Sequence, residues 1–284
     1  MMTHMSHTDV LPPEQGATRG KTPLDTSLLK QLFYDQANIL HEDCSSSSTD
    51  AAYCYDAANH AACSIALQAM GVFVEFVQCY LYCIQIMQYY LATGHGLAVS
   101  SYGGTPKSIC MGLVQGSGAA PGAWIAVSTV IVGAYKRRGY GAHLVGGWSQ
   151  TQIPLSALLY LDDTDLLHKQ EHSHGPQDTL VPWVQEATNH WAHLLHATGG
   201  NLKPAKCYWY LLQYRFIKGI ASLASKAQLS HHFLSIPQPD GSQVSIDLKD
   251  PTEASNVLGV LASPTGDGEP MLHHMLSKGY KWSH

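Results

Sequence analysis

The chain has 284 residues, of which 45% are hydrophobic and 13% are charged. This composition excludes a disordered or fibrous protein and predicts a globular chain with enough material for one large domain or two small ones. The formal net charge of −5 and the 16 lysines and arginines argue against tight nucleic-acid binding by charge alone, because phosphate binding requires cationic side chains.

Cysteine usage and hydropathy limit the cellular context. The seven cysteines are scattered and form no CxxC pair, which predicts an intracellular, reducing compartment, either cytoplasm or nucleus. The first 15 residues lack the apolar core of a secretory signal. Residues 73–91 are the most apolar stretch, but polar residues interrupt them, so we expect a buried helix running into a strand and no membrane span.

The first quarter of the chain is predicted to be helical around one short strand. A polar, loose segment at 1–23 precedes a helix at 24–41, with Asp25 as its cap. Ser45 to Ser48 are expected to form a low-complexity loop that leads to a short strand ending at Asp50. Helices are predicted at about 59–70 and 73–87.

The rest of the chain alternates strands and helices. Strand-like segments surround the Gly-rich stretch at 94–104, and a helix is expected from Pro121 to about Tyr135. A hairpin at 156–167, a helix near 178–197 and a strand at 206–212 follow, with a hairpin turn at Asp240-Gly241. This order predicts an α/β (α+β) fold of the split βαβ type, an antiparallel sheet with helices on one face.

Two adjacent aspartates occupy the tip of the predicted hairpin. Residues 156–167 read SALLYLDDTDLL, which is typical of two strands joined by a tight turn at Asp162 and Asp163. Their like charges repel unless a cation or a proton intervenes, so the pair favours a divalent metal site. A plain Asp-rich turn is the alternative.

Further carboxylates and a Gly-rich loop lie upstream. Residues 49–63, TDAAYCYDAANHAAC, contain Asp50 and Asp56, and residues 112–124 read GLVQGSGAAPGAW. Glycines in the second segment allow the backbone to approach a ligand closely, and Pro121 is suited to begin a helix. Two-metal phosphoryl transfer requires carboxylates that converge from separate parts of a chain, as these segments would supply.

These segments, in this order, resemble the palm of a reverse transcriptase. Asp50, Tyr55 and Asp56 resemble motif A, Gln115-Gly116 with Pro121 resembles motif B, and the run Tyr160–Asp163 resembles the YxDD of motif C. Residues 197–212 and 256–268 are similar to motifs D and E, and EQGATRGK at 14–21 is similar to a stretch that precedes motif A. The strings CYDAANHA and QGSGAAP point to the non-LTR retroelement type.

The resemblance implies an RNA-directed DNA polymerase that extends a DNA primer on an RNA template with dNTPs. Asp50, Asp162 and Asp163 would hold two Mg²⁺ ions, or Mn²⁺, because hard cations prefer carboxylate oxygens. Asp56 and Asp165 are expected to be structural. For Asp50 the alternative is a helix N-terminal cap.

The remaining site residues follow from the motifs. Lys206 would protonate the departing pyrophosphate, and a surface lysine after a turn is the alternative. Tyr55 would exclude a ribose 2′-hydroxyl, unless it is a core tyrosine. The residues expected at the nucleotide are Ala51, Tyr55, Gln115 and Gly116, with a tight turn as the alternative for the last two. The residues expected at the primer or template are Tyr160, Leu258 and Gly259.

The resemblance also divides the chain. It implies an incomplete fingers region at 1–49, a palm with inserted helices at 50–263, and the start of a truncated thumb at 264–284. The competing interpretations are a catalytically silent palm that at most binds nucleic acid, and a decayed retroelement relic.

The sequence contains two groups of closely spaced histidines. His190, His193 and His196 recur every third residue on a predicted helix, but a zinc site would need further ligands. His168, His172 and His174 are expected on a solvated loop.

Overall fold

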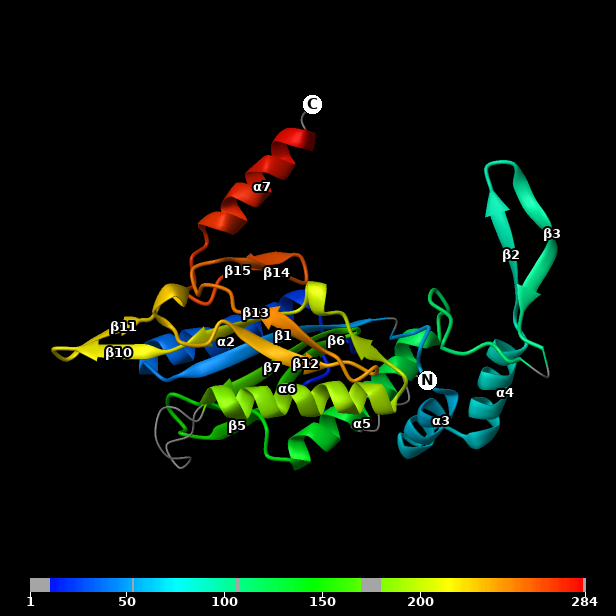
Figure 1. The fold of residues 1–284 in the computed structure, drawn as a ribbon, viewed down its shortest axis with the longest axis horizontal. Coiled ribbons are helices and arrows are strands. Elements are labelled where there is room, and N and C mark those ends of the chain that lie inside the picture. The colour runs from blue at the N-terminus through cyan, green and yellow to red at the C-terminus, as the bar shows by residue number, and fades with distance from the viewer. Residues whose placement is uncertain (1–10, 53, 106–107, 170–179, 283–284) are drawn as a thin grey trace.

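A five-stranded antiparallel sheet lies at the centre of the molecule (Figure 1). The computed structural model describes residues 11–52, 54–105, 108–169 and 180–282. The sheet contains β1 (Cys44–Ala52), β6 (Ala157–Tyr160), β7 (Asp163–Lys169), β8 (Asn201–Leu202) and β9 (Tyr208–Leu212). β7 pairs with β6 and β1, and β1 also pairs with β8 and β9, so β1 is a central strand.

The serine run belongs to this central strand, so the loop expected at Ser45 to Ser48 is wrong. Ser45, Ser46 and Ser47 are fully buried, and each pairs with residues of both β7 and β9. The hydroxyls of Tyr34 and Ser46 hydrogen-bond at 2.6 Å. Small side chains in β1 leave room for large aromatic neighbours such as Trp209 and Tyr210, and this packing overrides the low strand propensity of serine.

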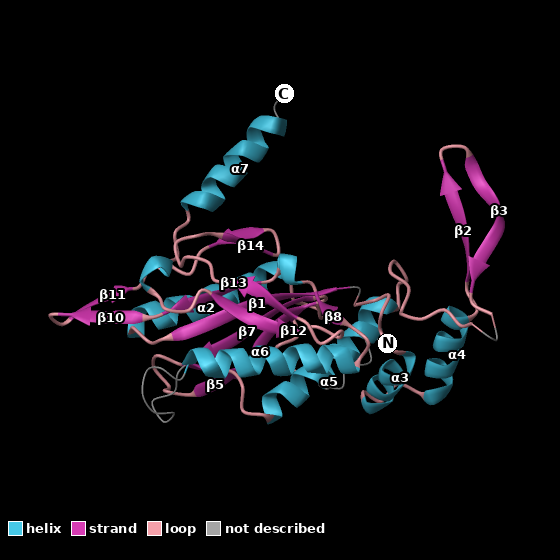
Figure 2. Ribbon diagram, in the orientation of Figure 1, coloured by secondary structure: helices cyan, strands magenta, loops and turns pink. Residues whose placement is uncertain are grey.

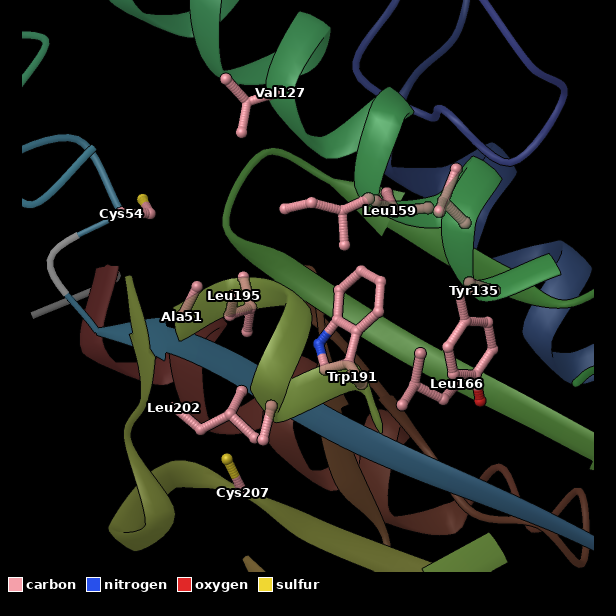
Figure 3. Packing of buried hydrophobic residues seen from close by; sticks show 14 of the residues in the cluster. Ala51, Cys54, Val127, Tyr135, Leu159, Leu166, Trp191, Leu195, Leu202 and Cys207 are labelled. Atoms are coloured by element: carbon pink, nitrogen blue, oxygen red, sulfur yellow. The ribbon is translucent and has the colours of Figure 1, made fainter. Parts of the chain in front are cut away.

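Helices α5 (Ala120–Arg137) and α6 (Leu180–Ala197) cover one face of the sheet. Trp191 of α6 is 2% exposed and lies among the labelled core side chains in Figure 3, together with Leu159 and Leu166 of the sheet. Trp209 of β9 belongs to the same buried cluster. This larger of two hydrophobic clusters therefore joins sheet and helices into one core.

Helix α2 (Pro23–Leu40) covers the opposite face, so the prediction of helices on one face only is wrong. Phe33 and Tyr34 of α2 form a second buried cluster with Leu158, Leu167 and Tyr210. Adjacent strand residues such as Leu158 and Leu159 point to opposite faces, and each face therefore requires its own cover. Figure 2 shows these helices around the central strands.

Most predicted helices are confirmed with small shifts at their ends. The N-terminal cap of α2 is Thr22 and not Asp25. Asp25, three residues later, instead bonds back to the N–H of Thr22 and so completes a capping box. Helices α3 (His60–Ala69) and α4 (Val74–Gln85) match the two predicted after Asp50, and Asn59 caps α3. Helix α6 is described only from Leu180, so the expected start at 178 lies outside the described residues.

An arm formed by α4 and a β-hairpin extends away from the sheet (Figure 1). The hairpin pairs β2 (Gln88–Thr93) with β3 (Gly96–Gly103). The expected passage from helix to strand within 73–91 is present, and the helix is buried on one face only, through Val77, Leu81 and Ile84. Other large apolar side chains of this stretch are exposed; they include Phe73, Phe76, Tyr82, Tyr90 and Leu91.

The remaining elements are hairpins and short helices at the rim of the sheet. The hairpins are β4 (Ala142–Val145) with β5 (Gln152–Leu155), β10 (Tyr214–Ile217) with β11 (Ile220–Leu223), β12 (Phe233–Pro237) with β13 (Gln243–Asp247), and β14 (Ser255–Val257) with β15 (Val260–Ala262). The predicted turn at Asp240-Gly241 joins β12 to β13. The short helices η3 (Pro204–Lys206) and η4 (Lys226–Gln228) and the terminal helix α7 (Glu269–Trp282) complete the described chain.

The environment of His168 and the character of the helices differ in how well they match the sequence-based expectations. His168 is not on a solvated loop: it is fully buried in β7, where its Nε2 and the Tyr135 hydroxyl hydrogen-bond at 2.6 Å. His172 and His174 lie outside the described residues. Of the helices within the described ranges, none has both the length and the apolar character needed to cross a membrane.

Candidate functional site

The predicted hairpin is present, but its two-residue turn lies one residue earlier than the expected turn at Asp162 and Asp163. Tyr160 at the end of β6 pairs with Asp163 at the start of β7, and Leu161 and Asp162 form the connection. Leu161 has a φ of 58°, a left-handed conformation that is strained for a leucine. A non-glycine residue held in this conformation is a recognised feature of functional sites.

The third aspartate lies beside this tip. Asp50 of β1 is directly opposite Asp163 of β7 in the antiparallel register, so the two side chains leave the sheet on the same face. The backbone N–H of Ala51 donates to the Asp162 carbonyl at 3.5 Å. The sheet thus brings residues from distant parts of the chain together, and the alternative of Asp50 as a helix cap is wrong.

A pocket of about 170 Å³ opens next to Asp50 and Asp162. Four predicted residues join them there: Ala51, Tyr55, Gln115 and Lys206. The other lining residues, which were not assigned to the site from the sequence, are Ala52, Cys54, Asp56 and Lys203. The pocket therefore collects side chains from motif-like segments that are well separated in sequence.

Asp56 and Lys203 show what sequence reasoning missed. Asp56 was assigned a structural role, yet its exposed side chain lines the pocket. Lys203 lies three residues before Lys206 in the loop leading to η3, and its backbone N–H donates to the Asp50 carbonyl at 2.9 Å. A second lysine beside the predicted one was the available signal for this residue.

Lys206 contacts Asp50 directly. Its Nζ donates to Asp50 Oδ2 at 2.8 Å, and the two side chains are 57% and 15% exposed. The hydrogen bond and the charge of Asp50 raise the pKa of Lys206, so the ammonium form is favoured. The negative charge of the Asp50 carboxylate is therefore balanced by the ammonium group of Lys206.

Asp163 lines an adjoining pocket, of about 50 Å³, and not the larger one. Burial is the largest cause that raises the pKa of Asp163 to about 6; the charges of Asp162, Asp165 and Asp50 act in the same direction, and Lys206 opposes them. The expectation that all three aspartates converge on one cleft is thus met by Asp50 and Asp162 only. Asp165 has the expected structural role, because it pairs with buried Lys30 at 2.6 Å.

The residues predicted to contact primer or template meet at this smaller pocket. Tyr160 and Leu258 both line it, although they belong to different hairpins. Leu258 and Gly259 connect β14 to β15 with φ values of 52° and 91°, the positive values of a type I′ turn. Gly259 is not among the lining residues. The turns of two hairpins, each with a leucine in the left-handed conformation (Leu161 and Leu258), therefore lie beside the two pockets.

The Gly-rich loop is held against Tyr55 by a close backbone approach. The N–H of Leu113 donates to the Tyr55 carbonyl at 2.5 Å. A Cβ on Gly112, whose φ is 81°, would lie 2.4 Å from the Asp56 carbonyl oxygen, so only glycine fits there. Sequence reasoning did not single out Gly112.

Gln115 and Gly116 form the tight turn that was the alternative to nucleotide contact. The N–H of Ser117 donates to the Val114 carbonyl at 3.0 Å, and Gly116 has a φ of 92°, as the third residue of a type II turn requires. Gln115 nevertheless lines the larger pocket with an exposed side chain. Gly116 is exposed and is not a lining residue.

The segment before α2 also reaches this end of the molecule. Gln15 donates through Nε2 to the hydroxyl of Ser128 at 2.8 Å, and the N–H of Gly16 donates to the Leu159 carbonyl at 2.7 Å. A Cβ on Gly16 would lie 2.2 Å from Thr26 Oγ1, which explains the glycine. Residues 14–21 therefore connect β6 and α5 through hydrogen bonds close to the aspartate turn.

The three predicted histidines of α6 have separate environments. The His190 ring stacks near Tyr135, with ring centroids 6.5 Å apart, whereas His196 Nε2 and Asn201 Oδ1 hydrogen-bond at 2.8 Å. The rings of His193 and His196 are 6.3 Å apart.

The carboxylate oxygens at this site are ligands of the kind that a hard divalent cation prefers. Asp50 and Asp162 present carboxylates to one pocket, and burial together with the neighbouring aspartates raises the pKa of Asp163 beside it, so a cation there would find several carboxylate oxygens. Across the described ranges, no three His, Cys, Asp or Glu side chains are already arranged to hold a metal ion. In this conformation Asp50 is engaged by Lys206 instead.

Comparison with known proteins places the fold. No protein-family model matches the chain, and no curated protein sequence matches it. Among solved structures, telomerase from Candida albicans in complex with a TWJ fragment of telomeric RNA aligns with a TM-score of 0.52 at 9% identity, over 94% of this chain and 37% of that one. Apo telomerase from Candida tropicalis aligns with a TM-score of 0.52 at 11% identity, over 93% of this chain and 39% of that one.

This chain spans about two-fifths of the length of those telomerase chains. At such low identities the likeness concerns the fold alone. The described structure is thus a mixed α/β fold with antiparallel sheets, similar to part of telomerase.

Proposed function

We propose that this chain is the palm-containing core of an RNA-directed DNA polymerase, which extends a DNA primer on an RNA template with dNTPs. One observation carries the proposal: Asp50, Tyr55, Gln115, Asp162 and Lys206, each expected in the site from its motif, line one pocket. The fold supports it, because telomerase is itself a relative of reverse transcriptases.

The strand order supports the assignment of a palm. β6, β7, β1 and β9 are adjacent in that order, with helices between β1 and β6 and α6 between β7 and β9. We propose that this order represents a split βαβ unit. We also propose a fingers remnant at the start of the chain, a palm that contains the whole of β1 and extends to 263, and the start of a thumb at 264–284, within a protein of the non-LTR retroelement type.

Asp50, Asp162 and Asp163 are the residues proposed to hold two Mg²⁺ ions, or Mn²⁺. When bound, such ions supply stabilisation of the charge that develops on the attacking and leaving oxygens. Asp50, which is paired with Lys206 in this structure, would be one of the residues that hold a cation. Lys206, beside the pocket, would donate a proton to the pyrophosphate oxygen as that group departs.

The neighbouring residues would orient the substrates. Tyr55 presents its ring at the pocket, where it would exclude a 2′-hydroxyl by contact, while Ala51, Gln115 and Gly116 would lie along the incoming nucleotide. The hairpin tips that carry Tyr160 and Leu258-Gly259 border the adjoining pocket, where they would contact the primer or template.

Primer extension by an Asp162→Asn variant of the whole chain tests the proposal. The amide is nearly isosteric with the carboxylate, so packing survives, but a negative ligand is lost. We expect extension on an RNA template with Mg²⁺ to fall by about 10³-fold or more, since electrostatic and metal stabilisation supply most of the acceleration. Circular dichroism should show an unchanged fold. Asp247→Asn, at an exposed strand position, is the matched control and should extend normally.

A catalytically silent palm is the second candidate, and the ion pair between Lys206 and Asp50 favours it, because that pair occupies a proposed metal ligand. A wild-type chain that binds an RNA–DNA hybrid and extends nothing would support this candidate. Extension by Asp162→Asn at the wild-type rate would show that Asp162 is only a turn residue and would remove its proposed role as a metal ligand.

A further inference from the structure

Trp124 contacts both the aspartate turn and Tyr55 from a third part of the chain. It lies in the first turns of α5 and is 3% exposed. Its indole Nε1 donates to the Leu161 carbonyl at 2.8 Å, across 37 residues of sequence. Its ring centroid is 6.4 Å from that of Tyr55, with the two planes tilted by 57°. One side chain therefore touches both the aspartate turn and the ring proposed to select the sugar.

The hydrogen bond from Trp124 is made to the residue of the turn whose backbone conformation is strained. The Leu161 carbonyl belongs to the peptide unit that leads into Asp162, so the orientation of this unit sets the direction in which the Asp162 side chain leaves the backbone. Leu161 occupies a left-handed conformation that a branched side chain disfavours. A directed hydrogen bond to its carbonyl opposes relaxation of the turn.

Burial of the indole alone does not explain this bond. Trp191 and Trp209 are buried to a similar degree, and their Nε1 atoms have no hydrogen-bond partner in the described part of the chain. The fold thus tolerates a buried indole without a partner at two other positions. At Trp124 the donor is instead directed to the peptide unit beside a proposed metal ligand.

We propose that Trp124 is a positioning residue that holds Asp162 toward the pocket and couples it to Tyr55. Its indole N–H fixes the Leu161 carbonyl, and its ring limits the positions open to the Tyr55 ring. This inference rests on the proposed function for the roles of Asp162 and Tyr55. The conformation of the turn itself is independent of those roles.

Hydrogen exchange and Mn²⁺ binding test the inference on the whole chain. Trp124→Phe keeps an aromatic ring and removes the donor, and Trp148→Phe is the matched control because Trp148 is fully exposed. In the metal-free protein, Trp124→Phe should speed amide exchange in the peptide 158–166. Mn²⁺ affinity, measured by electron paramagnetic resonance, should fall by roughly fivefold, the effect of one net hydrogen bond. Trp148→Phe should change neither quantity.

Leu161→Gly supplies a rescue that a merely structural role would not give. Glycine adopts positive φ without strain, so the turn should no longer depend on the indole. The double variant Trp124→Phe/Leu161→Gly should recover slow exchange in the hairpin and most of the Mn²⁺ affinity. If Trp124 only fills space, the double variant will be no better than Trp124→Phe.

Each further outcome also decides between the alternatives. Unchanged exchange in Trp124→Phe, or faster exchange with unchanged Mn²⁺ affinity, overturns the inference. If Trp124→Phe does not fold, folding of the double variant supports the inference and its failure to fold overturns it. A wild-type chain that does not bind Mn²⁺ overturns the proposed function, and the role of Trp124 in the turn is then decided by hairpin exchange and its reversal by Leu161→Gly.

Discussion

The central sheet and the hairpin of β2 and β3 are both rich in apolar residues, but only the sheet buries them. Leu158 and Leu159 of β6 enter different hydrophobic clusters, one under α2 and the other under α5 and α6. In the hairpin, Leu91, Leu97 and Val99 are exposed, because a two-stranded hairpin has no further layer to cover it. Apolar composition therefore predicts burial only where the topology supplies a partner for each face.

The two regions also differ in charge. Residues 76–105, which include the hairpin of the arm, contain no lysine, arginine, aspartate or glutamate. The end of the sheet, by contrast, gathers five aspartates and two lysines around two pockets. The ionic chemistry proposed for this protein is thus confined to the sheet, and the predictions below test that division.

The largest contrast is expected in stability. Leu166→Ala, at a fully buried position of β7, should lower the free energy of unfolding by about 3 kcal/mol, because transfer and cavity terms add. Leu97→Ala in the arm, where the side chain is 67% exposed, should change it by less than about 0.5 kcal/mol. Urea denaturation of both variants measures the difference. Equal losses would mean that the arm is packed against another surface.

A second contrast concerns sugar selection at the sheet. Tyr55→Ala should raise ribonucleotide incorporation relative to deoxyribonucleotide by about tenfold, because steric exclusion in a packed site is lost. Tyr55→Phe retains the ring and should keep the wild-type ratio. Incorporation efficiencies on one primer–template pair give the answer. A folded Tyr55→Ala variant with an unchanged ratio would make Tyr55 a core tyrosine.

A third effect is a pH dependence of stability from Asp163. Its pKa is raised from 3.8 to about 6, so the folded protein binds this proton more tightly than the unfolded chain does. The resulting stabilisation is complete below about pH 4 and is lost as the pH rises through about 6. We expect a contribution of about 1 kcal/mol, reduced by the solvent exposure of the side chain.

Asp163→Asn should remove this dependence and stabilise the protein at pH 7.5. Because other carboxyl groups titrate in the same range, the measured quantity is the difference between variant and wild type in urea unfolding at pH 4.5 and 7.5. Asp247→Asn, at an exposed strand position, should leave the wild-type profile. A profile for Asp163→Asn parallel to that of the wild type would show that burial and neighbouring charge do not act on Asp163.

The smallest effect is expected from the exposed partner of Asp50. Lys206→Ala removes a competitor for this carboxylate and should tighten Mn²⁺ binding by roughly two- to fivefold, in keeping with a partly solvated ion pair. Lys278→Ala, in the terminal helix, is a control that should not alter binding. Weaker binding in Lys206→Ala would show that the lysine supports the metal site and does not compete with it.

The sequence by itself determined the local features of this protein. Helical spacing of apolar residues located α2, Pro121 located the start of α5, and two apolar runs around Asp162 and Asp163 located the hairpin. These signals are short-range, since each depends on residues a few positions apart.

Only the tertiary structure decided which residues meet and what is buried. It placed the serine run in a central strand, α2 on the second face, Asp163 in the adjoining pocket and Asp56 and Lys203 at the main one. It also showed that Trp124 donates to the Leu161 carbonyl and that Gly112 lies against the backbone of Asp56. Such contacts join residues far apart in sequence, so their geometry arises from the packing of whole elements and leaves no local pattern to detect.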